Sequence, residues 1–374
     1  MKSIIYLFLA LITISLSAQS NSATWYLNDT SQSGIQSSES IASGGQSFAV
    51  GNSIASGYGS IALLNAVASG PESVAIGRTV YAQGQCAVAL GSGQSSATGD
   101  FSTVLGFSNQ AIGDHSTAMG TNTIASGTNS VAIGNNLNAT EIYSVAIGTL
   151  NTSSGYASTT LGDSNWASGR ASMAIGAGTI AEDYAMLSIG TWSLPLENPN
   201  PSQFSNSNTA FLIGNGPNAD SRSNAVQILF DGTTTIAGDL SINSDARLKA
   251  NIISLGNTLG KVLQIDGKSY TMKKDDKKKQ KIGVLAQDIE KVFPELVSES
   301  NGVKSVNYQG LVPVLINALK EQQSEIDVLK DQERKYLEQE KRLERLENLL
   351  GQTFQMTLNT FICLVIEINL VEIE

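Results

Sequence analysis

The sequence is poor in the residues on which most catalytic and metal sites depend, with one histidine and two cysteines among 374 residues. His115 lies within the Ser/Gly-rich stretch IGDHSTAMG, where a solvated turn residue is expected, so a Ser-His-Asp triad is excluded. Cys86 and Cys363 lie far apart, and neither belongs to a pair at zinc-ligand spacing. We therefore expect no metal, no cofactor and no intrachain disulfide, and we interpret both cysteines as structural.

Charged residues are also scarce. They make up 15% of the chain, and the net charge is −10. Because binding to phosphates needs a clustered positive surface, this balance argues against nucleic acid as a partner. The one basic run, 273-KKDDKKKQK-281, is interrupted by two aspartates. It is interpreted as a solvated hairpin tip, with a polyanion site as the alternative.

Long apolar runs occur only at the two ends of the chain. The N-terminal segment carries one lysine, an apolar run over residues 4–16 and small residues up to Ala18. This pattern is typical of a secretory signal cut after Ala18, and it predicts export to the cell surface or beyond. The last, 360-TFICLVIEINLVEIE-374, is β-rich and too short and charged for a spanning helix, so no membrane span is expected in the mature chain. A buried strand, a sorting segment and a reading-frame artefact all stay open for it.

What the chain has in excess is a short repeat. The block SVAIG occurs at 73–77, 130–134 and 144–148, and variants continue to 187-LSIG-190. The closing glycine recurs every 14 residues, with one step of 15. Within the block, Val131 and Ile133 point to one face of a strand, while Ser130, Ala132 and Gly134 point to the other. One face should meet a hydrophobic core, and the other needs small side chains.

A coil of this length cannot bury a core alone, so the repeats should stack about 4.8 Å apart as a solenoid. Low-complexity disorder is the alternative, but a disordered chain has no reason to keep a fixed register. The register and the NSVAIG wording at 129–134 resemble the head repeats of YadA-type trimeric adhesins over about residues 40–190. That resemblance implies a left-handed parallel β-roll and a homotrimer, whose head would face an unknown host or surface ligand.

The composition changes at 241-SINSDARLKANI-252. Ser244 and Lys249 would lie about 140° apart on a helix and on opposite faces of a strand. They meet only if Asp245 and Ala246 turn the chain, and Asn-Ser-Asp is turn-prone. A Ser-Lys pair is a known way to activate a nucleophile without histidine. A helix N-cap at Ser244 or Asp245 followed by two surface basic residues is the alternative.

From residue 244 the sequence resembles the endosialidase-type intramolecular chaperones, the self-cleaving end domains of phage tail spikes and related fibres. Three blocks carry the resemblance in order: 244-SDARLKANI-252, 282-IGVLAQDIEKVFPELV-297 and 304-KSVNYQGLVPVLINALKEQ-322. It implies that Ser244 is the nucleophile, that Lys249 is its general base, and that the bond between Asn243 and Ser244 is cut after a trimer assembles. Lys249 must be neutral to act as a base. The expected means is burial against four apolar residues, with or without a positive charge nearby: Ile282, Val284, Leu285 and Phe293.

The fold class predicted is mainly β: a left-handed parallel β-roll trimer, a short β neck, and an α+β chaperone domain ending in a coiled-coil helix. A heptad seam of leucines diluted by glutamates predicts the coiled coil, with a single amphipathic helix on a monomer as the alternative. The expected segments are a signal peptide at 1–18, an N-terminal segment at 19–39, head repeats at 40–192, a linker at 193–210, the neck at 211–243, the chaperone at 244–312, the coiled-coil helix at 313–350 and an apolar tail at 351–374.

These features together predict an exported homotrimeric fibre or adhesin-like surface protein. Its end domain would drive trimerisation and then cut itself off as a single-turnover serine autopeptidase, with no external substrate. Two alternatives keep the architecture: a permanent trimerisation cap with no cleavage, and a phage-type tail fibre. A hydrolase acting on glycans is disfavoured, because the repeats show no paired carboxylates.

Overall fold

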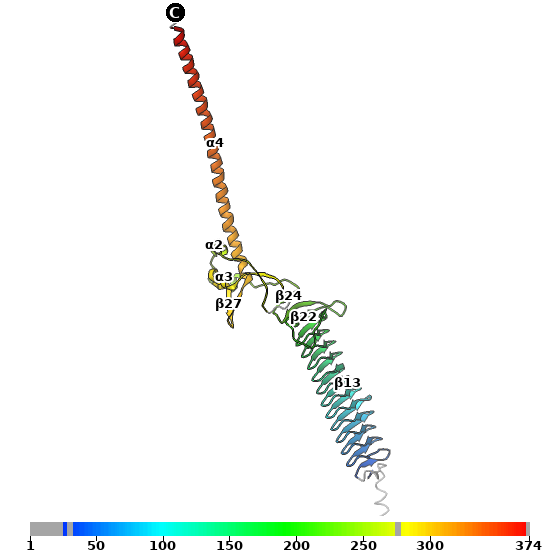
Figure 1. Cartoon of the computed structure of the whole chain (residues 1–374). Coiled ribbons are helices and arrows are strands. Elements are labelled where there is room, and N and C mark those ends of the chain that lie inside the picture. The colour runs from blue at the N-terminus through cyan, green and yellow to red at the C-terminus, as the bar shows by residue number, and fades with distance from the viewer. Residues whose placement is uncertain (1–24, 28–32, 274–277, 372–374) are drawn as a thin grey trace, which may run out of the picture. The chain divides into compact units, whose positions relative to one another are not determined.

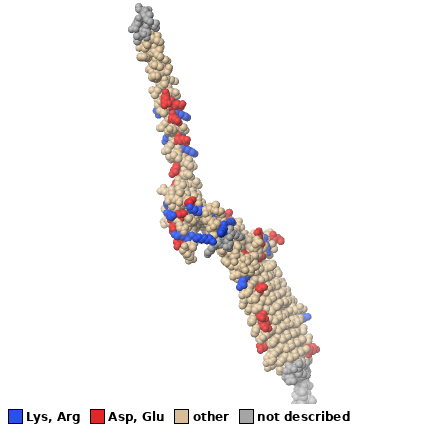
Figure 2. All heavy atoms as spheres, in the orientation of Figure 1, with Lys and Arg blue, Asp and Glu red and all other residues tan. Residues whose placement is uncertain are grey.

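The computed structural model describes residues 25–27, 33–273 and 278–371, so the expected signal peptide at 1–18 lies outside the described residues. The chain divides into two compact units, Met1–Ile242 and Asn243–Glu374. The division falls one residue before the predicted cleavage site. Figure 2 shows few charged side chains on the visible face of the first unit and many on the second.

The first unit is a mainly β solenoid of about 11 turns, in which successive strands stack in parallel (Figure 1). One column of strands carries the SVAIG motif and its variants: β3 (Phe48–Val50), β5 (Ile61–Leu63), β7 (Val74–Arg78), β9 (Val88–Ser92), β11 (Thr103–Phe107), β13 (Thr117–Ala125), β14 (Val131–Ala139), β15 (Val145–Thr149), β17 (Thr159–Asp163), β19 (Met173–Ala177) and β21 (Leu187–Thr191).

A second column of short strands closes each coil, and β13 and β14 run through both columns. Its separate members are β4 (Ile54–Ala55), β6 (Val67–Ala68), β8 (Tyr81–Ala82), β10 (Ser96–Ala97), β12 (Gln110–Ala111), β16 (Thr152–Ser153), β18 (Trp166–Ala167) and β20 (Ile180–Ala181). At the start of the solenoid, β1 (Trp25–Leu27) pairs antiparallel with β2 (Ile35–Ser37), which then pairs in parallel with β3.

Corresponding residues of neighbouring repeats lie directly opposite each other. Ala132 pairs with Ala146, and Gly134 pairs with Gly148. The 14-residue register predicted from the sequence is therefore the register of the parallel sheet, and the predicted solenoid is confirmed.

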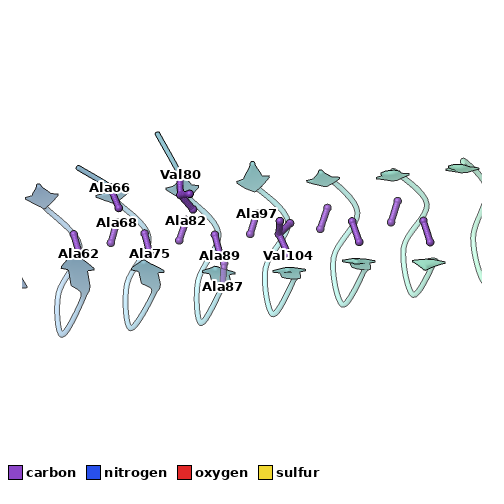
Figure 3. Close-up of a cluster of buried hydrophobic side chains, with 14 of the residues drawn as sticks. Ala62, Ala66, Ala68, Ala75, Val80, Ala82, Ala87, Ala89, Ala97 and Val104 are labelled. Atoms are coloured by element: carbon purple, nitrogen blue, oxygen red, sulfur yellow. The ribbon is translucent and has the colours of Figure 1, made fainter. Parts of the chain in front are cut away.

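The interior of the coils is built mainly from small side chains, with larger ones such as Leu137 and Asn151 buried in some coils. Ala132 and Ser130 are fully buried, whereas Val131 and Ile133 are only half-buried and face outward. Figure 3 shows the labelled alanines, such as Ala75, between the two columns of strands. A 14-residue coil is so narrow that alanine and serine fill it. The strongly apolar face is therefore the outer one in the single chain, which the alternation alone did not decide.

Two kinds of bend explain the two sets of glycines. Gly134 has φ +140°, and a Cβ there would lie 1.9 Å from the Gly148 carbonyl oxygen. Gly113 lacks a positive φ, but a Cβ there would lie 2.2 Å from the Gly127 oxygen. Residue 113 is therefore a glycine because the backbones of neighbouring coils approach closely there. The left-handed residue of that second bend is not glycine, since His115 has φ 57°.

The stretch at 193–210 is an excursion from the solenoid that returns to it. β22 (Thr209–Asn215) pairs in parallel with β21, and its Leu212 is fully buried. β22, expected at 211–220 in the neck, therefore belongs to the solenoid, and the boundary predicted at residue 211 was wrong. Buried Asp183 holds the excursion, accepting hydrogen bonds from the backbone nitrogens of Asn200 (2.7 Å) and Thr209 (2.6 Å). β23 (Asn224–Leu229) and β24 (Thr234–Ile236) then extend the sheet antiparallel.

The second unit is a small α+β domain followed by a long helix. Its elements are η1 (Ala246–Leu248), α2 (Thr258–Val262), the hairpin β25 (Lys268–Tyr270) and β26 (Lys281–Gly283), α3 (Ala286–Val292), η2 (Pro294–Leu296), the hairpin β27 (Val297–Ser300) and β28 (Val303–Val306), η3 (Tyr308–Gly310) and α4 (Leu311–Val371). Ile289, Val292, Phe293 and Val314 form its core.

Helix α4 continues past the end predicted at Leu350 to Val371, which excludes the buried strand that was one of the alternatives for the final segment. No proline follows Pro313, and a single glycine at 351 costs only about 1 kcal/mol in a helix. The hydroxyls of Thr353 and Thr357 bond to carbonyls one turn earlier, which keeps them compatible with a helix. By length and composition alone, α4 is long and apolar enough to cross a membrane. The expectation of no membrane span was based on residues 360–374 alone, whereas the apolar stretch of α4 begins before residue 360. That expectation is therefore not supported.

Candidate active site

The predicted site lies on one tight turn at the start of the second unit. Asp245 is the N-cap of η1, and its Oδ1 accepts a hydrogen bond from the Arg247 backbone nitrogen at 2.8 Å. Lys249 is the C-cap, and its backbone N–H donates to the Ala246 carbonyl. An Asp side chain that accepts from the nitrogen two residues later is a common way to start such a turn. The turn at Asp245 and Ala246 that the spacing required is therefore present.

This turn brings the two predicted site residues together. Lys249 Nζ lies 2.7 Å from Ser244 Oγ. A general base must lie within such a distance of the proton that it removes. Ser244, Lys249 and Asn243 are all exposed to solvent in the single chain.

The Asp245 carboxylate is held by a single neighbour. Arg247 Nε lies 3.1 Å from both carboxylate oxygens, and one terminal guanidinium nitrogen lies 2.6 Å from Oδ2. The guanidinium and the Arg247 backbone N–H lower the pKa of Asp245, and the carboxylate raises the pKa of Arg247. The sequence analysis missed this pair, although an acid and an arginine two residues apart directly after Ser244 were the available signal.

The apolar residues expected to bury Lys249 lie elsewhere. Ile282 is 86% exposed, and Phe293 is 2% exposed within the core of α3 and α4. The lysine over the Phe293 ring is Lys261, with its Nζ 5.2 Å from the ring centroid. In the single chain, then, these residues do not cover Lys249: Ile282 is exposed, and Val284 and Phe293 belong to the core around α3.

A second feature missed by the sequence analysis anchors the chain downstream of the site. The Glu321 carboxylate of α4 accepts hydrogen bonds from the backbone nitrogens of Thr258 and Leu259, each 2.9 Å long. These bonds satisfy free N–H groups at the start of α2 and lower the pKa of Glu321. Asn317 also donates to the Leu255 carbonyl at 2.9 Å. Two residues of α4 thus tie down the segment that follows Lys249.

The remaining candidate reactive residues lie outside this turn. His115 is exposed, and its ring stacks on Phe101 with the centroids 5.0 Å apart. Cys86 and Cys363 are both free. Among the described residues no cluster of histidine, cysteine, aspartate or glutamate could hold a metal ion.

The fold and the turn define a class of architecture: a solenoid of short repeats with a separate α+β end domain. Comparison with known families agrees with both resemblances. Residues 64–79 and 111–136 match the YadA head domain repeat, and residues 244–298 match the family described as chaperone of endosialidase. This chain therefore combines adhesin-type head repeats with an end domain similar to the endosialidase chaperones.

Curated relatives are phage fibre proteins. The long tail fiber proteins Gp37 of Enterobacteria phages M1 and Ox2 are each 35% identical over 115 residues, which is 27% of this chain and 46% of the relative. The Gp37 of Escherichia phage AR1 is 29% identical over 100 residues, covering 24% of this chain and 9% of the relative. The matches span less than half the length of these relatives.

Proposed function

We propose that this chain is an exported homotrimeric fibre or adhesin-like surface protein whose end domain gathers three copies and then cuts itself off between Asn243 and Ser244. The contact of 2.7 Å between Lys249 Nζ and Ser244 Oγ carries the proposal for cleavage. The matching family and the division of the chain beside Asn243 support it.

The proposed reaction uses only the chain and one water molecule. The neutral Lys249 amine takes the Ser244 hydroxyl proton, and the oxygen attacks the Asn243 carbonyl carbon. The C–N bond then breaks, the Ser244 nitrogen takes a proton from Lys249, and an ester joins Asn243 to Ser244 Oγ. Water hydrolyses the ester, leaving a carboxylate on Asn243 and restoring the Ser244 hydroxyl. Because the chain supplies its own carbonyl, folding replaces substrate binding.

The outer face of the solenoid supports the trimer. Large apolar side chains recur there along the column, and Ile61, Leu105 and Leu161 are 37–45% exposed. Apolar side chains that recur in this way on an outer surface are typical of an interaction surface. Three copies that pack these faces together would supply the core that the narrow coils lack.

The heptad seam of α4 also supports the trimer. Leu319, Leu329, Leu343 and Leu350, spaced as in heptads, are 58–69% exposed in the single chain. A three-helix coiled coil would bury them. Both units therefore present apolar surface that association of identical chains would cover.

One observation favours a second candidate. Ser244 and Lys249 are both exposed in the single chain, and the apolar residues expected to cover Lys249 lie elsewhere. In this candidate the end domain is a permanent trimerisation cap, and the contact between the two side chains is inert.

Denaturing electrophoresis of the wild-type chain beside Ser244→Ala and Lys249→Ala separates the two candidates. Self-cleavage predicts two fragments from the wild type, the smaller one beginning at Ser244 by mass spectrometry, and one band from each variant. One band throughout would leave the permanent cap. Native mass spectrometry of Ser244→Ala tests the trimer separately, because that variant keeps all of its segments.

A further inference from the structure

We propose that Arg247 is a positioning residue for the self-cleavage put forward above: it occupies the Asp245 carboxylate, which would otherwise pair with Lys249. The inference rests on the proposed function. It concerns a residue that neither touches the scissile bond nor exchanges a proton with it.

Every polar contact of the Asp245 carboxylate in this turn comes from Arg247. Oδ1 accepts from its backbone nitrogen at 2.8 Å and from Nε at 3.1 Å, and Oδ2 accepts from Nε at 3.1 Å and from the terminal nitrogen at 2.6 Å. Lys249, in contrast, reaches the Ser244 hydroxyl at 2.7 Å. One acid and two bases thus share a single turn, and the acid binds the base that does not react.

The choice of partner matters because the two bases differ. A guanidinium keeps its proton at any pH where proteins are stable, and it matches both oxygens of a carboxylate. An amine beside a free carboxylate is held in its charged form, which cannot take the serine proton. Asp245 is the N-cap and Lys249 the C-cap of the same three-residue turn, so the two side chains leave the chain at its two ends. Without Arg247, Asp245 is therefore a direct competitor of Ser244 for Lys249.

Stability does not explain the Asp245–Arg247 pair. The Arg247 side chain is 88% exposed and that of Asp245 is 42% exposed, and exposed ion pairs contribute little to folding. Among the described residues, the charged groups on this turn are Asp245, Arg247 and Lys249, and no described carboxylate lies within ion-pair distance of the Lys249 ammonium. The electrostatic surroundings of Lys249 in this unit are therefore set mainly by whether Asp245 is occupied.

The test compares the full-length wild type with three variants: Arg247→Gln, Asp245→Asn and the double variant. Each chain is recovered uncut from inclusion bodies and refolded at a series of pH values, and the rate of cleavage is measured. Arg247→Gln should slow cleavage at pH 7 on the order of tenfold and move the pH–rate profile to higher pH, because the freed carboxylate favours charged Lys249. Asp245→Asn keeps a capping side chain without the charge and should cut at close to the wild-type rate. The double variant should recover the wild-type rate and profile.

The recovery in the double variant distinguishes positioning from a merely structural role. Equal slowing in Arg247→Gln and in the double variant, with an unmoved pH profile, would overturn the inference, as would an unaffected Arg247→Gln. Arg247→Lys keeps a positive charge, so its cleavage rate should lie between those of the wild type and Arg247→Gln. If native mass spectrometry shows that Arg247→Gln does not assemble, Arg247→Lys replaces it in the test. A wild-type chain that never cuts contradicts the proposed function itself and this inference with it. A cut wild type with no rescue contradicts only the role of Arg247.

Discussion

Lys249 Nζ and Ser244 Oγ lie 2.7 Å apart across a single 3-10 turn. Neither a regular helix nor a strand would bring residues at this spacing together. The turn does so because the Asp245 side chain accepts from the Arg247 backbone nitrogen and starts η1 directly after Ser244. Any chemistry at Ser244 therefore depends on this local capping rather than on a preformed pocket.

The role of Lys249 as a base can be separated from its charge. Lys249→Arg keeps the positive charge, but a guanidinium does not lose its proton in proteins. We expect this variant to assemble as the wild type does and to show no cleavage on denaturing gels. If Lys249→Arg were cut at the wild-type rate, proton removal by Lys249 would be contradicted.

Gly134 should be essential to the solenoid. With φ +140° and a virtual Cβ 1.9 Å from the Gly148 oxygen, Gly134→Ala must strain the backbone and push two coils apart. A loss of at least about 1–3 kcal/mol is expected from the backbone strain alone. Gly238→Ala is the control, because a Cβ there meets nothing within 4 Å. Thermal unfolding followed by circular dichroism should show a lower Tm for the first variant only.

The buried amide of Asn151 should stabilise the contact between two neighbouring coils. Its Nδ2 donates to the carbonyls of Ile147 (2.6 Å) and Gly162 (2.9 Å), and its Oδ1 accepts from the Asn165 nitrogen at 2.8 Å. Asn151→Ala leaves these buried groups unpaired, at a cost of about 1–3 kcal/mol. Asn138→Ala, at a half-buried position in β14, is the comparison. Equal Tm values for the two variants would show that the amide contributes nothing.

The outward face of the solenoid should be an interface between chains. Ile133→Asp places a charge on that face without entering the alanine interior of the coil, so three packed copies should separate or fail to form. Asn135→Asp, on an exposed residue of the same strand, should leave the assembly intact. Light scattering at matched concentrations measures the difference, and an unchanged trimer with Ile133→Asp would contradict this interface.

Glu321 should make the stability of the second unit depend on pH. Its folded pKa is lowered, first by the hydrogen bond from the Leu259 nitrogen and then by that from Thr258. Its contribution is therefore complete above the pKa of an unfolded glutamate, about 4.3, and is lost as the pH falls through the lower folded value. In a Ser244→Ala background, Glu321→Gln should lower the Tm at pH 7, and the difference should shrink below about pH 4. A pH-independent difference would contradict this charged cap.

The sequence by itself determined the 14-residue register, the order of the segments up to α4 and the two family resemblances. Strand alternation and glycine spacing are local properties, so they can be read without knowing which parts of the chain meet. The tertiary structure decided that alanines rather than Val131 and Ile133 fill the coil, because only the width of the closed coil sets which face fits inside. It likewise decided that β22 returns to the solenoid and that Lys249 reaches Ser244, since both depend on how the chain turns between residues whose spacing leaves the outcome open.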